Sequence, residues 1–238
     1  MKRYQPGPVW FFDLDNTLHD ASTAIFPAIA ANMNAFISGV LGNAAMPQVQ
    51  AAANAARLHY TRRYGAALLG MVLHHQVRAA DFLHAAHQFD DLHSMISSER
   101  GLARLLAALP GRKILLTNAP RRYSSAVMRH LKLKKHFSSH VAIESMTVFR
   151  HLRPKPARSL LRKMAAREGV KPARCILVED TVANLKAARA VGMRTAWITG
   201  YLAAPPATPG LLRKRPLYVD LKLPALGGLR RRASVLLR

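Results

Sequence analysis

The sequence predicts an α/β protein with a doubly wound parallel β-sheet and an inserted all-helical segment. Short apolar runs of strand length recur along the chain, and from residue 101 onward they alternate with segments of helical apolar spacing. Polar or acidic residues follow several of these runs directly. Residues 19–97 show only helical patterns, with many alanines and few β-branched runs.

The first predicted strand covers residues 9–14, and its continuous apolar run is typical of a strand buried on both faces. Glycine and proline mark the ends of several elements that follow. We expect further strands over 113–117, 140–143, 174–178, 194–198 and 217–219. We expect helices over 24–39, 46–64, 66–75, 79–89, 102–109, 124–133, 157–168 and 182–191. The segments 203–216 and 227–238 are expected to be loop or loosely held chain.

The pattern predicts two domains, an α/β core of residues 1–18 and 98–238 and a helical domain of residues 19–97. The formal net charge is +24, and all of it lies after residue 100, because residues 1–100 contain 7 basic and 7 acidic residues. Such a charge attracts anions, although arginines at helical spacing on solvated faces explain it equally well. The single cysteine and the lack of a long apolar stretch predict a cytoplasmic protein without a membrane partner.

Two carboxylates, Asp13 and Asp15, stand at the carboxyl end of the first predicted strand. Catalytic groups of parallel sheets lie beyond the carboxyl ends of the strands. One carboxylate at such a place can attack phosphorus while the other transfers a proton to the leaving group. Because two close carboxylates repel each other, the pair also predicts a bound cation.

Polar side chains that suit phosphate follow at two later points of the chain. Thr117 and Asn118 come directly after a predicted strand and can donate hydrogen bonds to phosphate oxygens. Lys155 lies between two prolines, which hold the backbone extended and stiff. A lysine held in this way can neutralise a phosphate and a nucleophile together.

A second acidic pair, Glu179 and Asp180, follows the predicted strand 174–178. Magnesium prefers oxygen ligands and binds through one or two carboxylates and several waters. Asp13, the backbone carbonyl of Asp15, and Asp180 would supply such a set. Asn184 follows about one helical turn later and could orient Asp180 or a water.

The order of these motifs resembles the haloacid dehalogenase-like hydrolase superfamily. Its first motif is matched by Phe-Asp-Leu-Asp-Asn-Thr-Leu at residues 12–18, and Thr-Asn, Lys and Glu-Asp follow in family order. The resemblance implies a Rossmann-like core with a helical cap at 19–97, a Mg²⁺ cofactor and an aspartyl-phosphate intermediate. The implied roles are nucleophile for Asp13, general acid and base for Asp15, phosphate binding for Thr117 and Lys155, and metal binding for Asp180 supported by Glu179.

The segment Leu-His-Asp-Ala-Ser at 18–22, with Arg63 and Tyr64, is similar to the pyrimidine 5'-nucleotidase branch of that superfamily. This implies hydrolysis of nucleoside 5'-monophosphates, with Tyr64 stacking on the base and Arg63 contacting phosphate or base. A phosphoglycolate or sugar-phosphate phosphatase and a phosphomutase remain alternatives. A nucleic-acid-binding protein on a retired enzyme core is a third reading, which the charge favours and the intact acidic motifs oppose.

Overall fold

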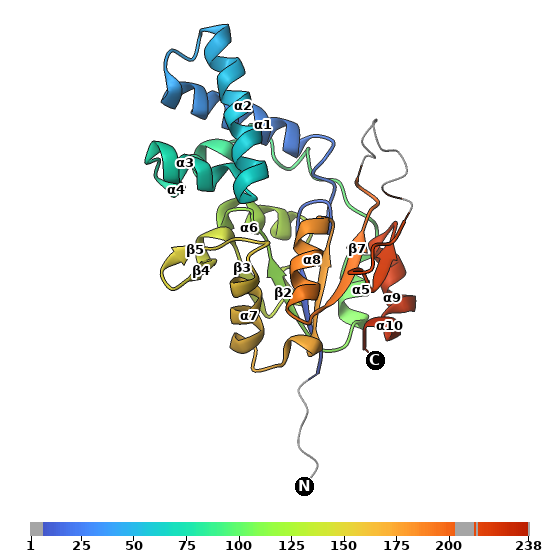
Figure 1. Cartoon of the computed structure of the whole chain (residues 1–238). Helices are drawn as coiled ribbons and strands as arrows, with labels where there is room; N and C mark the ends of the chain where they lie inside the picture. Colours follow the sequence, from blue (N-terminus) through green and yellow to red (C-terminus); the bar gives the residue numbers. More distant parts are fainter. Residues whose placement is uncertain (1–6, 203–211, 213, 238) are drawn as a thin grey trace. The chain divides into compact units, whose positions relative to one another are not determined.

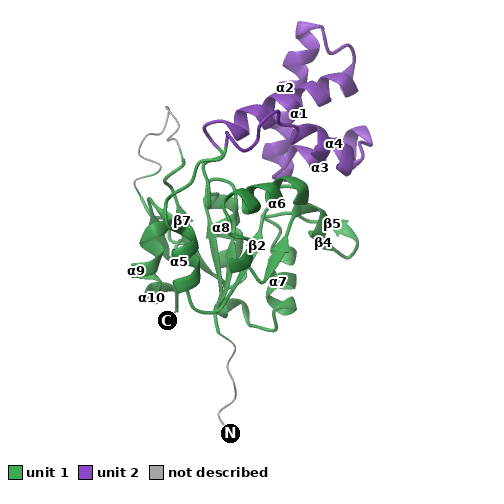
Figure 2. Ribbon diagram, turned by 180° about the vertical axis from the view of Figure 1, so that it is seen from behind, with its two compact units in different colours: residues 1–21, 96–238 green, residues 22–95 purple. Residues whose placement is uncertain are grey.

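The structure is a computed structural model that describes residues 7–202, 212 and 214–237 (Figure 1). The chain divides into two compact units (Figure 2). The core unit consists of residues 1–21 and 96–238, and the helical unit consists of residues 22–95. The two units are described separately below.

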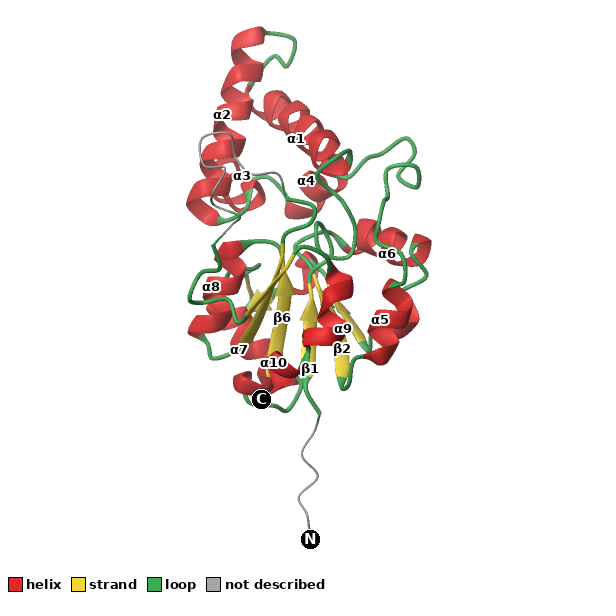
Figure 3. Cartoon of the chain, turned by 90° about the vertical axis from the view of Figure 1, so that its right-hand side faces the viewer, coloured by secondary structure: helices red, strands yellow, loops and turns green. Residues whose placement is uncertain are grey.

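The core unit contains a six-stranded, fully parallel sheet with the strand order β3-β2-β1-β6-β7-β8. Figure 3 shows strands of this sheet in yellow, among them β1, β2 and β6. This arrangement confirms the predicted α/β class. Strand β1 lies inside the sheet between β2 and β6, where its apolar residues are shielded on both faces. The strands are β1 (Val9–Phe12), β2 (Arg112–Leu116), β3 (Ser139–Val141), β6 (Cys175–Glu179), β7 (Arg194–Ile198) and β8 (Leu221–Leu223).

Helices follow the strands of the core unit in the alternating pattern that the sequence predicts. The α-helices are α5 (Leu102–Ala108), α6 (Arg121–His130), α7 (Arg158–Arg167), α8 (Val182–Ala190), α9 (Leu229–Arg232) and α10 (Ser234–Leu237). Short 3₁₀ helices are η1 (Lys134–His136), η2 (Ile143–Ser145), η3 (Pro172–Arg174) and η4 (Leu226–Gly228). Ile114 and Leu116 of β2 join one buried cluster with leucines of α7 and α8, and Leu115 between them points to the opposite face of the sheet.

The register of the sheet brings the ends of three strands together. Phe12 of β1 pairs with Leu115 of β2 and with Val178 of β6. The residues that follow these strands therefore emerge together at the carboxyl-terminal end of the sheet. Ligand-binding and active sites of parallel sheets lie at this end.

The helical unit contains α1 (Ile25–Leu41), α2 (Pro47–Tyr64), α3 (Ala67–His75) and α4 (Ala79–Ala86). Phe36 of α1 meets Phe82 of α4 edge to face, with ring centroids 5.4 Å apart. Tyr60 of α2 packs directly on Gly70 of α3, where a Cβ atom would lie 2.1 Å from the tyrosine ring. A side chain at position 70 would therefore separate the two helices. Among the described helices of the chain, none combines the length and apolar character needed to cross a membrane.

The C-terminal tail corrects one expectation, because residues 227–237 form η4, α9 and α10 rather than a loop. Leu226, Leu229 and Leu236 are buried. Their spacing of three and seven residues is that of one helix face, which the adjacent arginines obscure in the sequence. Most of the expected loop 203–216 lies outside the described residues.

The last strand is also displaced from its expected position at 217–219 to Leu221–Leu223. Leu217 is fully exposed, whereas Leu221 and Leu223 are buried against the sheet. The carboxylate of Asp220 fixes this register by accepting hydrogen bonds from the backbone N and the hydroxyl of Thr195, at 2.9 and 3.2 Å.

The sequence analysis also missed a short antiparallel pair, β4 (Thr147–Val148) and β5 (His151–Leu152). Its turn residues Phe149 and Arg150 both have positive φ, at 48° and 65°. Tight hairpin turns of this kind usually contain Asn or Gly, so the usual sequence signal is absent here.

Candidate active site

Asp13 is the first residue after β1, and its backbone N donates a hydrogen bond to Val178 of the neighbouring strand at 3.0 Å. The residue is only 6% exposed. The main chain of Asp13 is therefore fixed by the strand end, and its nearly buried carboxylate lies at the carboxyl-terminal end of the sheet.

Lys155 bridges Asp13 to the second acidic motif. Its Nζ donates hydrogen bonds to Asp13 Oδ1 at 2.6 Å and to Glu179 Oε2 at 2.7 Å. The lysine is 2% exposed, although its side chain is one of the longest in the chain. A lysine is almost never buried in this way unless carboxylates pair with it.

Asn118 holds the backbone of Lys155 in place. Its Oδ1 accepts a hydrogen bond from Lys155 N at 3.0 Å, and its Nδ2 donates one to Lys155 O at 2.9 Å. The preceding residue, Thr117, is buried at the end of β2, where its backbone N donates to Val141 and its hydroxyl accepts from Ala119 N. The structure thus gives Asn118 a positioning contact that the sequence did not reveal.

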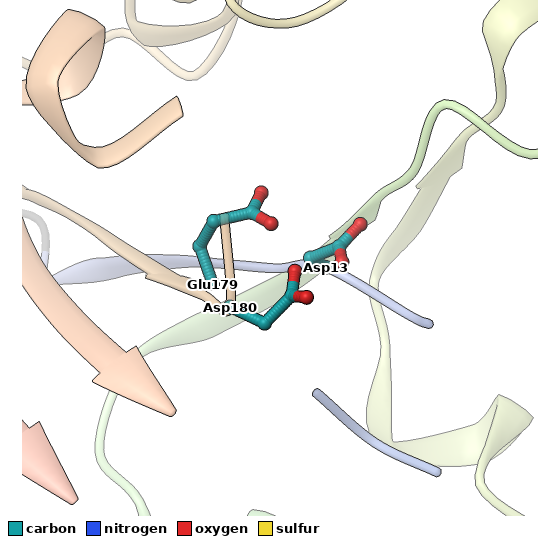
Figure 4. A group of neighbouring side chains, drawn as sticks. All are labelled: Asp13, Glu179 and Asp180. Carbon is teal, nitrogen blue, oxygen red and sulfur yellow. The ribbon is translucent and has the colours of Figure 1, made fainter. Parts of the chain in front are cut away.

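Glu179 ends β6 and Asp180 follows it, so both acids lie beside Asp13 (Figure 4). One carboxylate oxygen from each of the three residues lies within 4.8 Å of the other two. Trp197 Nε1 donates a hydrogen bond to the Asp180 carbonyl at 2.8 Å, and Thr181 Oγ1 donates one to Asp180 Oδ1 at 3.0 Å. These contacts hold the main chain and side chain of Asp180 in place.

The charges of this group are not balanced by the protein alone. Three carboxylates and the Lys155 ammonium leave a formal charge of −2 when all four groups are ionised. Burial and the Glu179 carboxylate raise the pKa of Asp13 to about 8, against the opposing effect of Lys155. Burial and Glu179 also raise the pKa of Asp180 to about 9. Burial is the largest single effect on Glu179 and opposes its ionisation, but the Lys155 charge and the hydrogen bonds from Asp180, Lys155 and Thr181 N together hold the pKa of Glu179 below its ordinary value.

This group fits a divalent cation, because two positive charges would cancel the remaining charge and favour the ionised carboxylates against the burial and repulsion that raise their pKa values. The available donors are carboxylate oxygens, which are the ligands that Mg²⁺ prefers. Asp13 and Asp180 could bind the ion directly, whereas one Glu179 oxygen already accepts from Lys155.

Asp15 lies apart from the acidic group and has its own hydrogen-bond partners. Its Oδ1 accepts a hydrogen bond from the hydroxyl of Tyr123 at 2.6 Å and lies 2.9 Å from His19 Nε2. Tyr123 and His19 are buried, and their own polar atoms are 3.4 Å apart. The contacts fix the orientation of the Asp15 carboxylate while leaving its side chain 15% exposed.

His19 and Tyr123 are the main site residues that the sequence analysis missed. His19 lies four residues after Asp15 in a turn segment, so this contact is at least local in the sequence. Tyr123 lies 108 residues away on α6, and only the β1–β2 pairing brings it close. A single sequence contains no signal for a contact of that kind.

The remaining predicted site residues have different positions. Asn184 is buried in the first turn of α8. Arg63 and Tyr64 lie at the end of α2 in the helical unit, where Arg63 is exposed and the Tyr64 hydroxyl lies 2.6 Å from His74 Nε2. A role for Arg63 and Tyr64 in substrate binding therefore remains a prediction.

Comparison with known proteins identifies a family and several solved structures that are similar to this chain. The family described as haloacid dehalogenase-like hydrolase matches residues 9–192. Solved structures match almost the whole chain at low sequence identity. An L-2-haloacid dehalogenase from Xanthobacter autotrophicus matches with a TM-score of 0.59 and 17% identity, over 96% of this chain and 98% of the other.

Two further structures give similar values. A HAD phosphatase from Thermococcus onnurineus matches with a TM-score of 0.60 and 16% identity, over 95% of this chain and 97% of the other. A conserved haloacid dehalogenase-like protein of unknown function from Agrobacterium tumefaciens matches with a TM-score of 0.59 and 18% identity, over 98% and 100% of the two chains. At these identities the structures indicate a shared fold.

Proposed function

Because this chain belongs to the haloacid dehalogenase-like hydrolase family, we propose that it is a phosphatase that acts on small phosphomonoesters. The main support is the buried group in which Lys155 bridges Asp13 and Glu179 beside Asp180. A nucleophilic carboxylate, a fixed ammonium and a site suited to a divalent cation are the groups that phosphoryl transfer requires. The presence of a second carboxylate, Asp15, favours phosphate transfer over dehalogenation, since only the former needs this acid and base.

The proposed reaction has two displacements at phosphorus. An Asp13 oxygen forms a bond to phosphorus while the bond to the leaving oxygen breaks, and Asp15 gives its proton to that oxygen. Asp15 then takes a proton from water as the water attacks the phosphorus of the Asp13 acyl phosphate, which releases inorganic phosphate and restores Asp13. Lys155 and Thr117 contact the phosphate oxygens. A Mg²⁺ ion held by Asp13 and Asp180 would neutralise phosphate and nucleophile when bound.

Pyrimidine nucleoside 5'-monophosphates are the proposed substrates, and the helical unit is the proposed cap. The support is the similarity of residues 18–22 and of Arg63 and Tyr64 to the nucleotidase branch. A phosphoglycolate or sugar-phosphate phosphatase and a phosphomutase would use the same core residues. They differ in the group that the cap admits, or in whether water or a substrate hydroxyl accepts the phosphoryl group.

A phosphate-release assay separates these possibilities. Purified protein is supplied with UMP, CMP, AMP, a sugar phosphate and phosphoglycolate, each with MgCl₂ or EDTA. We expect Mg²⁺-dependent phosphate release with the highest kcat/KM for UMP or CMP. Equal or higher kcat/KM values for the other esters would overturn the nucleotide assignment. If none of the compounds released phosphate, the proposal that the protein is a phosphatase would be contradicted.

The pH dependence of stability tests the proposed metal site. In metal-free protein Asp13 and Asp180, with pKa values raised to about 8 and about 9, bind more protons in the folded than in the unfolded state. Stability should therefore fall as the pH rises from about 4 to about 9, by up to about 1.4 kcal/mol per pH unit for each group. Since Mg²⁺ needs ionised carboxylates, its stabilising effect should grow over the same range.

The measurement is the thermal midpoint in EDTA and in excess MgCl₂ from pH 6 to pH 9. The double variant Asp13→Asn with Asp180→Asn provides the control, because it should flatten the metal-free slope and abolish the Mg²⁺ effect. A Mg²⁺ effect that is independent of pH, or that survives in the double variant, would argue against this site.

Tyr123→Phe tests the positioning of Asp15. The substitution removes only the hydroxyl that donates to Asp15 at 2.6 Å. Hydrogen bonds to charged groups contribute about 1.5–3 kcal/mol, so kcat should fall about 10- to 100-fold while KM changes little. Tyr201→Phe is the matched control, because its hydroxyl accepts from Glu99 N instead. This role would be refuted if steady-state kinetics showed a change in KM alone, or if kcat fell equally in the control.

A further inference from the structure

A pocket of about 380 Å³ lies at the edge of the core unit next to strand β3. Its walls come from β2, α6, the segment around η1, and β3. The volume lies within the range of about 300–1,000 Å³ that is usual for small-molecule sites. The pocket can therefore hold a metabolite-sized molecule.

The pocket is separate from the proposed catalytic site. None of Asp13, Thr117, Lys155 and Asp180 lines it. Leu115, which does line it, points away from the face of the sheet that α7 and α8 cover. Helix α6 contacts both sites from different sides, with Tyr123 at Asp15 and other residues at the pocket.

The charged lining of the pocket is entirely basic. Arg121, Arg129 and Lys134 line it, and no lining residue is acidic. The nearby Glu144 accepts hydrogen bonds from the backbone N of Arg121 at 2.9 and 3.1 Å. Within residues 7–202, 212 and 214–237, no acidic side chain forms a salt bridge with these three residues. Three cations around one hollow without paired acids favour an anionic ligand.

Arg121 is already held in place on the wall of the pocket. Its Nη2 donates hydrogen bonds to the His140 carbonyl at 2.9 Å and to Ser145 Oγ at 3.3 Å. Both bonds use the same nitrogen, so the other guanidinium nitrogens remain available for an anion. A guanidinium fixed in advance loses less conformational freedom when it binds.

The inner part of the pocket is apolar. Leu115 and Met128 are buried, and the Phe137 ring meets Phe12 edge to face with centroids 5.9 Å apart. Phe137 is the apolar lining residue that is only half-buried, so an inorganic ion would leave its ring in contact with water. A ligand with an apolar group attached to its anionic end would cover it.

We propose that this pocket binds a small organic phosphate, whose phosphate contacts Arg121, Arg129 and Lys134 and whose apolar group covers the half-buried ring of Phe137. The inference does not depend on the proposed catalytic activity. It gives one local use for positive charge in the strongly basic C-terminal half of the chain.

Phenylphosphonate is a suitable probe, because it combines a dianion with a flat apolar ring and its C–P bond resists hydrolysis by phosphatases. The experiment titrates it into ¹⁵N-labelled full-length protein in EDTA and follows the backbone amide signals by NMR. We expect saturable shifts at residues 129, 134 and 137–140, with a dissociation constant of about 1 mM or below. Binding at the catalytic site would instead shift residues around Asp13 and Thr117, so the two sites are read separately.

The double variant Arg129→Ala with Lys134→Ala should weaken binding at the pocket at least about tenfold, since two charge-assisted contacts are lost. The matched control is Arg162→Ala with Lys171→Ala, which removes the same charges at exposed positions outside the pocket and should leave the affinity unchanged. Inorganic phosphate should bind more weakly than phenylphosphonate. Unsaturable shifts at the pocket, equal losses in both double variants, or equal affinity for inorganic phosphate would each overturn the proposal.

Discussion

Asp13→Asn is expected to lower Mg²⁺-dependent phosphate release by at least about 10⁴-fold, because the amide cannot form the acyl phosphate. The loss should appear in kcat, since the substitution preserves the size of the side chain. The fold should remain intact, because the variant removes a carboxylate that burial and Glu179 make costly to ionise. Steady-state kinetics with the best substrate of the panel, together with a circular dichroism spectrum, measure both effects.

Asp90→Asn is the matched control for this variant, because Asp90 is an exposed carboxylate of the helical unit. It should retain wild-type activity within about twofold, as is usual for surface substitutions. If Asp13→Asn kept more than about a hundredth of the wild-type rate, Asp13 could not be the nucleophile.

Lys155→Met is expected to damage both stability and activity. The ammonium lies 2.6 Å from Asp13 and 2.7 Å from Glu179, and all three groups are buried. Removing one partner of a buried ion pair costs about 3–5 kcal/mol, because the other charge stays buried without compensation. Activity should fall at least about 100-fold, since the lysine also contacts the phosphate in the proposed reaction.

Urea unfolding at pH 8 and pH 5 measures the stability of this variant. The destabilisation should be smaller at pH 5, where the acids left unpaired can take up protons. Lys163→Met is the control, because its Nζ donates only to the Thr147 carbonyl at an exposed position. A Lys155→Met protein as stable as this control, with activity within about tenfold of wild type, would contradict the bridging role.

Much of the core architecture follows from the sequence for a simple physical reason. The strands of a buried parallel sheet must be apolar on both faces, so runs such as 9–12 and 175–178 stand out from the amphipathic helices. The acids that follow them are equally visible, because a carboxylate beside a buried run needs a positive or hydrogen-bonding partner. The convergence of Asp13 and Asp180 then follows from parallel pairing of β1 with β6.

Other features depend on tertiary contacts that a single sequence does not encode locally. The contact of Tyr123 with Asp15 requires α6 to lie over the end of β1. The hydrogen bonds between Asn118 and the backbone of Lys155 join residues that are 37 positions apart. The C-terminal helices were hidden because a run of three arginines, residues 230–232, separates the buried Leu229 and Leu236. The turn of the β4–β5 hairpin uses phenylalanine and arginine at positive φ, which composition alone does not suggest.

The most direct test of the account is to trap the phosphoryl group on Asp13. Enzyme that is turning over substrate with Mg²⁺ is quenched in acid and treated with borohydride, which reduces an aspartyl phosphate to homoserine, and the peptides are then sequenced by mass spectrometry. The account predicts homoserine at position 13 only when substrate and Mg²⁺ are both present. Turnover without any modification at position 13, or with the modification at a different carboxylate, would contradict it.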